Sequence, residues 1–360
     1  MTESAVIKRW VHSHIRSLDA YSVAKADHLV KLDAMENPYV WDEELRTKWL
    51  EVLRATEVNR YPDGKASELA ASLTDTFSIP VSLGLLLGNG SDELIQTIAL
   101  AVGGSGRVMI SSEPSFSMYR VIASVTGSAY VATPRDEKFD IDADALLRAV
   151  VQHDPCCVFI ASPNNPTGNT CDPNLIERVA EACSGIVVVD EAYHAFSKSS
   201  FIDRVQGHEN VVLLRTLSKL GLAGLRLGFL MGDSSLLHEL NKIRLPYNVN
   251  ALTQASAAFA LRHLDWFDDK AEKIKNARSD LFLALSSIAE LEVYPSEANF
   301  ILFRVPKGLG ETVFAKLKTH GVLVKNLHGS HPQLSDCLRV TGSTPEENRL
   351  FLDALTLALG

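Results

Sequence analysis

Apolar positions follow two periodicities along the chain, and their alternation predicts alternating strands and helices between about residues 65 and 232. Short apolar, β-branched runs predict strands at 82–87, 107–111, 129–133, 157–161, 186–189, 211–214 and 228–231. Helical spacing predicts helices that include 66–77, 91–102, 115–127 and 173–183. Strands that are apolar throughout are buried on both faces, as in a mostly parallel sheet covered by helices. The pattern therefore predicts an α/β layered fold.

The pattern changes on both sides of this region. Residues 1–45 are predicted to form an N-terminal arm with a strand-like stretch at 28–32, and residues 46–245 a large domain. Residues 246–360 are predicted to form a smaller α+β domain, which the arm joins. Its expected strands are 299–304, 322–325 and 337–341, and its expected helices include 311–320 and 345–358.

Composition and charge exclude several classes of protein. The chain has 360 residues, of which 46% are hydrophobic, and a net charge of −9, without the clustered Lys and Arg of a nucleic-acid binder. No run of about 18 apolar residues predicts a membrane span, and the first residues lack the apolar core of a signal peptide. Five cysteines without CxxC or Cys/His spacing predict buried thiols and no metal site. We expect a cytoplasmic protein.

Polar residues follow the first two of four informative strands. GNGSDE at 88–93 ends a strand and opens a helix with Ser91, Asp92 and Glu93. The free N–H groups there predict a phosphate seat, although an ordinary helix cap would read the same. SPNNPTG at 162–168 holds Asn165 between two prolines, where its amide could contact a ligand or simply belong to a turn.

The other two strands end on charged residues. Asp190 closes the buried strand of VVDEAY, and a buried carboxylate needs a partner such as a protonated ring nitrogen, an arginine or a metal. Lys219 lies in an apolar, glycine-rich stretch, where burial lowers the pKa of a lysine and favours Schiff-base chemistry; a lysine at a domain edge is the alternative. Taken together, a phosphate seat, an amide, a buried acid and a lysine match the needs of pyridoxal 5'-phosphate.

The ordered series of motifs resembles the fold-type I pyridoxal-phosphate aminotransferases, and within them the histidinol-phosphate branch. The segments that carry it are ENPY at 36–39, NRYPD at 59–63, GNGSDE at 88–93, PSFSMY at 114–119, SPNNPTG at 162–168, VVDEAY at 188–193, RTLSKLGLAGLR at 215–226, NF at 299–300 and CLRVTGSTPEEN at 337–348. The resemblance implies a three-layer transferase fold and a cofactor held by residues 46–245. It also implies a homodimer with shared active sites, to which the arm contributes. The implied reaction moves an amino group between L-histidinol phosphate and 2-oxoglutarate in histidine biosynthesis.

The resemblance also implies roles for individual residues. Lys219 would hold the cofactor as a Schiff base and move the substrate proton, and Asp190 would pair with the pyridinium nitrogen. Asn165 and Tyr193 would bind the phenolic oxygen, and Phe116 would stack on the ring. The remaining cofactor contacts, mostly to the phosphate, would come from Ser91, Asp92, Glu93, Thr216, Ser218 and Arg226, with Tyr61 reaching in from the neighbouring subunit. The substrate would be bound by Tyr21, Asn37, Tyr61, Lys325 and Arg339.

Two departures from the family pattern leave alternatives open. A second arginine that relatives carry shortly before the LR pair is missing, so Lys325 or Asn326 would take its place. Arg226 follows Lys219 by seven positions, one fewer than is common in relatives. The competing functions are an aminotransferase for aromatic amino acids and a lyase of the same fold, such as a threonine-phosphate decarboxylase. A non-catalytic regulator is disfavoured because no helix-turn-helix pattern precedes the fold.

Overall fold

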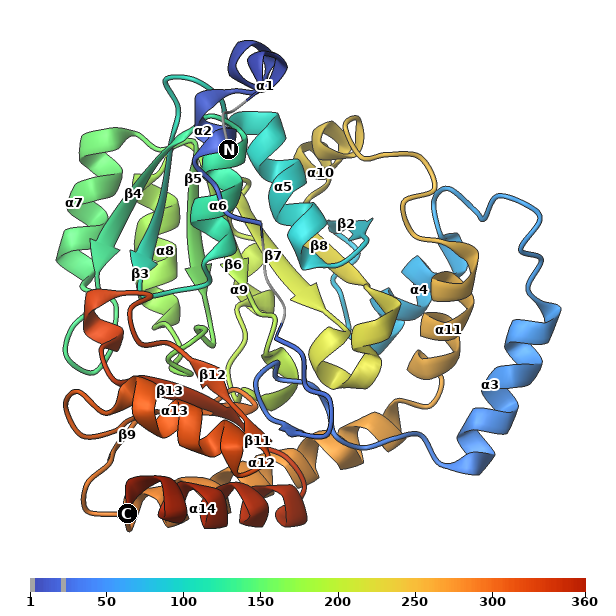
Figure 1. Ribbon diagram of the computed structural model, residues 1–360. Helices are drawn as coiled ribbons and strands as arrows, with labels where there is room; N and C mark the ends of the chain where they lie inside the picture. Colours follow the sequence, from blue (N-terminus) through green and yellow to red (C-terminus); the bar gives the residue numbers. More distant parts are fainter. Residues whose placement is uncertain (1–3, 21–23) are drawn as a thin grey trace.

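The computed structural model describes residues 4–20 and 24–360 and is built around a seven-stranded sheet (Figure 1). The strand order is β2-β8-β7-β6-β5-β3-β4. The strands are β2 (Leu83–Gly88), β3 (Val108–Glu113), β4 (Ala129–Pro134), β5 (Cys157–Ala161), β6 (Ile186–Asp190), β7 (Val211–Thr216) and β8 (Gly228–Asp233). Strands β3 to β7 pair in parallel, and β8 is antiparallel to both of its neighbours. The prediction of a mostly parallel sheet is confirmed.

Helices cover both faces of this sheet and make three layers. One face carries α5 (Ser91–Val102), α6 (Met118–Val125) and α10 (Ser234–Asn241). The other carries α4 (Ser67–Thr76), α7 (Ala143–His153), α8 (Pro173–Ala182), α9 (Ile202–Val205) and α11 (Ala251–Leu261). Alternate residues of a strand enter the two cores: Val187 and Val189 of β6 pack on one side and Val188 on the other. This alternation explains why the central strands are apolar throughout.

A second, four-stranded sheet of order β12-β13-β10-β9 lies beside the first, in the lower part of Figure 1. Its strands are β9 (Glu292–Val293), β10 (Phe300–Arg304), β12 (Lys325–Asn326) and β13 (Cys337–Thr341). It packs with α12 (Leu264–Ser286), α13 (Gly310–Thr319) and α14 (Pro345–Leu359). Short 3₁₀ or irregular turns are η1 (His194–Phe196), η2 (Ser218–Leu222), η3 (Ala223–Leu225) and η4 (Pro332–Leu334).

The N-terminal arm is bonded to this second unit through a short pair of strands. Strand β1 (Val30–Lys31) pairs in parallel with β11 (Val322–Leu323). The single strand predicted at 322–325 is therefore two short strands, because β11 pairs with the arm while β12 pairs with β13. The arm also contains α1 (Ala5–Trp10) and α2 (Ser13–Arg16), and α3 (Glu43–Ala55) follows with Asp42 as its cap.

The division into domains near residue 245 stays a prediction. Helix α11 packs against α3 and α4 beside the large sheet, and α12 leads from there to the small sheet. Within the described part of the chain, no helix is both long enough and apolar enough to cross a membrane.

Candidate active site

The sheet brings four strand ends to one edge. Strands β5, β6 and β7 are parallel, and β2 has the same direction because both β2 and β7 are antiparallel to β8. Strand β8 starts at this edge. One cavity there is lined by ten of the predicted residues: Ser91, Asp92, Phe116, Asn165, Asp190, Tyr193, Thr216, Ser218, Lys219 and Arg226. Residues far apart in the sequence thus face one space, as ligands of open α/β sheets require.

Lys219 lies in this cavity just after β7. Its Nζ donates a hydrogen bond to the carbonyl of Ala34 at 3.3 Å and lies 5.9 Å from the ring centroid of Tyr193. Burial, together with the nearby guanidinium of Arg339, lowers the pKa of Lys219 to about 8. A substantial fraction of the amine is therefore neutral near pH 8, which a nucleophile or base requires.

Asp190 ends β6 as a buried carboxylate. One oxygen accepts a 2.6 Å hydrogen bond from the hydroxyl of Tyr119, and the other accepts from the N–H of Ala192 at 3.0 Å. Burial raises the pKa of Asp190 to about 6. No basic side chain of the described residues forms an ion pair with Asp190. The site therefore offers a buried anion to a cationic ligand.

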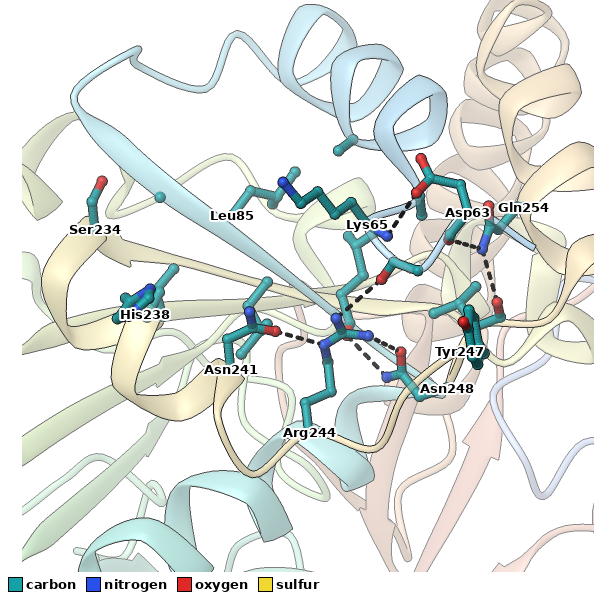
Figure 2. Close-up of a pocket in the computed structure, with 18 residues that line it drawn as sticks. Asp63, Lys65, Leu85, Ser234, His238, Asn241, Arg244, Tyr247, Asn248 and Gln254 are labelled. Atoms are coloured by element: carbon teal, nitrogen blue, oxygen red, sulfur yellow. Dashed lines mark hydrogen bonds between the residues drawn. The ribbon is translucent and has the colours of Figure 1, made fainter. Parts of the chain in front are cut away.

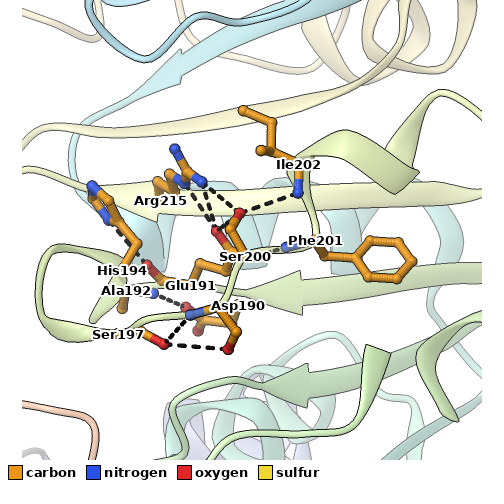
Figure 3. Close-up of polar contacts among 10 residues, drawn as sticks. Asp190, Glu191, Ala192, His194, Ser197, Ser200, Phe201, Ile202 and Arg215 are labelled. Atoms are coloured by element: carbon orange, nitrogen blue, oxygen red, sulfur yellow. Dashed lines mark hydrogen bonds and ion pairs between the residues drawn. The ribbon is translucent and has the colours of Figure 1, made fainter. Parts of the chain in front are cut away.

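The next residue, Glu191, belongs to the frame of the site (Figure 3). Its Oε2 accepts from Nε and Nη2 of Arg215 at 3.0 and 2.8 Å, and from Ser200 Oγ at 3.0 Å. Its Oε1 accepts the N–H of Phe201 at 2.6 Å. The side chains of Glu191 and Arg215 are only 2% and 6% exposed. This buried pair ties the ends of β6 and β7 together directly behind Asp190.

The predicted phosphate seat surrounds the start of α5. Gly90 has φ +89°, a backbone conformation that favours glycine, and Nη2 of Arg226 lies 2.6 Å from where a Cβ would stand. Arg226 Nη2 lies 3.6 Å from Asp92 Oδ2, and the hydroxyls of Thr216 and Ser218 are 2.9 Å apart. Burial raises the pKa of Asp92, and its Oδ1 has no hydrogen-bond partner among the described residues. Hydroxyls, a guanidinium and a helix N-terminus converge here, as an anion site requires.

Glu93 does not line this cavity among the described residues. Its Oε2 accepts the N–H of Asn89 at 2.5 Å and Nδ2 of Asn248 at 2.7 Å. Asn248 in turn accepts from Nη1 of Arg244. Glu93 therefore supports the loop that carries the phosphate seat, whereas the sequence analysis placed it with the cofactor contacts.

Two predicted substrate residues, Asn37 and Tyr61, do not line this cavity. Asn37 donates to the carbonyl of Leu220 at 3.0 Å and so supports the turn after Lys219. Tyr61 is 81% exposed and stacks on Tyr247, with ring centroids 4.5 Å apart, outside the cavity of its own chain. Tyr21 lies outside the described residues.

Arg339 on β13 connects the small sheet to the cavity. It is buried, donates to the side-chain oxygen of Asn165, and donates through Nη2 to the carbonyl of Asp33 at 2.9 Å. Lys325 pairs with Arg339 across β12 and β13, and directly paired residues share one face of a sheet. Asn326 donates instead to Glu311 on α13. Of the two alternatives, the register brings Lys325 to the face of Arg339.

The chain matches the sequence model of the family described as aminotransferase class I and II over residues 27–355. The chain belongs to the aminotransferase class I and II family. It is 48% identical to histidinol-phosphate aminotransferase 2 of Nitrosococcus oceani, over 97% of each chain. It is 43% identical to the histidinol-phosphate aminotransferase of Chromobacterium violaceum, over 97% of this chain and 98% of the relative. Histidinol-phosphate aminotransferase from Sinorhizobium meliloti, solved in complex with pyridoxal-5'-phosphate, has the same fold, with a TM-score of 0.88 over 98% of each chain at 22% identity.

A second hollow of this aminotransferase is larger, about 320 Å³ against about 120 Å³ (Figure 2). Lys65, His238, Arg244 and Asn248 contribute to its lining. Among the described residues, none of those predicted for catalysis or cofactor binding lines this hollow. The guanidinium of Arg244 already donates to the side chains of Asn241 and Asn248 and to the carbonyl of Gly64. Size alone therefore does not identify the active site; the convergent chemistry of the smaller cavity does.

Five lining residues of the active-site cavity were not among the predicted site residues: Met35, Tyr119, Ala161, Pro163 and Ala192. Two of them, Tyr119 and Met35, bring a polar or a long side chain to the site. Tyr119 bonds Asp190, and Met35 reaches the cavity from the arm. Tyr119 stands in the PSFSMY motif on the apolar face of α6, so a hydroxyl on a buried helical face was the available signal. For Met35 the sequence holds no such signal, because its position depends on the arm folding back over the sheet.

Proposed function

We propose that this aminotransferase uses pyridoxal 5'-phosphate to transfer the amino group between L-histidinol phosphate and 2-oxoglutarate in histidine biosynthesis. The names of relatives 48% and 43% identical over nearly the whole chain support the substrate. The observation that carries the chemistry is the single cavity that joins a lysine of lowered pKa, a buried carboxylate and a phosphate seat.

The residues present fit this cofactor. Asp190 is a buried anion without a cationic partner among the described residues, which a protonated pyridine nitrogen would supply. The phosphate would meet the N-terminus of α5, the hydroxyls of Thr216 and Ser218, and Arg226. When bound, the cofactor supplies an electron sink for the bond that breaks at the substrate Cα.

The protein's own groups would then direct the proton. Lys219 would hold the cofactor's aldehyde, and its amine, once displaced, would take the proton from the Cα of the amino donor. Burial raises the pKa of Tyr193, so its phenol stays a hydrogen-bond donor toward the cofactor's oxygen, beside Asn165. Arg339 would bind the phosphate of histidinol phosphate and the carboxylate of glutamate in turn, since its fork suits both anions.

We infer that Lys325 assists Arg339 with the substrate phosphate. The two side chains share a sheet face, and a phosphate carries more charge than a carboxylate. Lys325→Ala should therefore lower kcat/KM for histidinol phosphate more than kcat/KM for glutamate in steady-state measurements. Asn326→Ala is the matched control on the opposite face, and an equal loss in both variants would contradict the assignment.

We also propose a homodimer in which Tyr61 completes the partner's site. Its high exposure and its stacking on Tyr247 support this, because two stacked aromatic rings left in water suit an interface. Sedimentation should give a dimer. Tyr61→Ala should weaken cofactor binding without dissociating the dimer, and unchanged cofactor affinity would refute the shared site.

The substrate is tested by a spectral titration of the cofactor-loaded protein. Histidinol phosphate should shift the cofactor absorbance at low concentration, and 2-oxoglutarate should restore it. Borohydride should fix the cofactor on Lys219, and Lys219→Ala should abolish that label. A response to phenylalanine or tyrosine without one to histidinol phosphate would favour an aromatic aminotransferase. Release of carbon dioxide from an amino-acid phosphate, without need for 2-oxoglutarate, would favour a lyase.

A further inference from the structure

The active-site cavity is lined from two sides. Fourteen of its fifteen described lining residues fall between positions 91 and 226, on the large sheet and its helices. The remaining one is Met35, in the arm segment between β1 and α3 that is bonded to the small sheet. Met35 therefore faces the cavity from the side of Arg339, which is the side proposed for the substrate.

The backbone of Met35 is held in an uncommon conformation. Its φ is +53°, in the left-handed region that favours glycine and that a long side chain seldom adopts. Its N–H donates to Thr341 Oγ1 at 3.0 Å, and its carbonyl accepts from Nδ2 of Asn299 at 3.0 Å. Thr341 and Asn299 are both buried. Such a conformation persists only where the surroundings enforce it, and it is enforced here from both sides.

The preceding carbonyls extend the same arrangement. The carbonyl of Leu32 accepts from the N–H and Oγ1 of Thr341 at 2.9 and 2.8 Å. The carbonyl of Asp33 accepts from Nη2 of Arg339, and that of Ala34 accepts from Nζ of Lys219. Four successive carbonyls, Leu32–Met35, are thus bonded to the small sheet or to the site. This segment, here called the strap, holds Met35 at the cavity, directly after the carbonyls that bond Arg339 and Lys219.

We propose that Met35 is a specificity-determining residue whose thioether packs on the ring of a heteroaromatic amino donor. The proposal rests on the proposed function. An unbranched, polarisable thioether makes favourable contacts with aromatic rings and adapts its shape. It would favour the imidazole of histidinol phosphate, and it could move aside for the flexible, ringless side chain of glutamate. One residue would thereby serve two donors that differ in shape.

The test compares donors with and without a ring. L-alaninol phosphate keeps the amine and the phosphate of histidinol phosphate but has a methyl group in place of the imidazolylmethyl group. Dissociation constants would be measured from the absorbance of the cofactor-loaded protein, and the unfolding midpoint would report on the strap. Met35→Ala and Met35→Gly both remove the thioether, and Gly also accepts the positive φ. Met35→Leu retains apolar volume as the control.

Both truncations should weaken the binding of histidinol phosphate about 2- to 10-fold, which is the range of a sulfur–aromatic contact. They should change the dissociation constants of alaninol phosphate and glutamate by less than about 2-fold. Met35→Leu should lose less affinity for histidinol phosphate than the two truncations do. Equal weakening of the donors with and without a ring, or no weakening of either, would overturn the proposal. If the unaltered protein binds phenylalanine but not histidinol phosphate, the proposed function fails; the role of Met35 is then decided by the same comparison with phenylalanine and alanine.

Discussion

Asp190 should make the cofactor-free protein lose stability as the pH rises. Burial holds its pKa at about 6 in the folded chain, about 2 units above its ordinary value of 3.8. At 1.36 kcal/mol per unit, the ionised carboxylate costs the folded state about 3 kcal/mol. Below about pH 4 both states hold the proton and the cost is absent. It grows between pH 4 and 6, where the unfolded chain ionises first, and is complete above pH 6.

The assay is urea unfolding of the cofactor-free protein and of Asp190→Asn across pH 4 to 8. Asn does not titrate and keeps an oxygen for the hydroxyl of Tyr119, so the difference between the two proteins isolates this carboxyl. The free energy of unfolding of the wild type should fall, relative to that of the variant, by about 3 kcal/mol as the pH rises through this range. Asp75→Asn, an exposed substitution on α4, controls for the amide itself.

A difference that stays constant within about 1 kcal/mol over this range would refute the reasoning, because the carboxyl would then have the same pKa folded and unfolded. With the cofactor bound, a pyridinium beside Asp190 should remove most of the pH dependence. The same charge that destabilises the empty protein would then contribute to cofactor affinity.

Three further outcomes follow from the contacts around the site. Tyr119→Phe removes the 2.6 Å hydrogen bond and should raise the pKa of Asp190 by about 1 to 2 units, which the same unfolding series would show as a higher pH midpoint; an unmoved midpoint would contradict it. Arg215→Met leaves Glu191 buried without its main partner and should lower the free energy of unfolding by about 3 to 5 kcal/mol. Adding Glu191→Gln should recover part of that loss, and a double variant as unstable as the sum of the single ones would refute the pairing. Arg339→Ala should lower kcat/KM at least about 10-fold in both half-reactions, and unchanged kinetics with either donor would exclude its role with the substrate anion.

The strand ends could be predicted because their signals are local. Apolar, β-branched runs locate the strands, and parallel strands place their carboxyl ends at one edge. Lys219, Asp190 and Asn165 each follow such a run, so their meeting in one cavity follows from the sheet alone. The same argument holds for the helix N-terminus at Ser91.

The missed features depend on contacts between distant segments. Glu93 stands in the predicted phosphate motif, but its partner Asn248 comes from a loop 155 positions later. The stretch at 322–325 forms two short strands because its first half pairs with β1 of the arm. Met35 enters the cavity through bonds to residues about 300 positions away. No periodicity within a segment records such pairings.

The alternation of side chains along a strand decides which of two neighbouring polar residues does chemistry. Val188 of β6 packs on the face that carries α6, and Asp190, two positions on, bonds Tyr119 of that helix. Val189 packs on the other face, and Glu191, again two positions on, bonds Arg215, whose odd-numbered neighbours on β7 pack on that same face. Thr216 follows Arg215 and returns to the cavity. The two pairs of adjacent polar residues are thereby each divided, one member facing the cavity and the other the frame. A period of two, read from the apolar residues before each pair, therefore assigns the roles once the functional face is known.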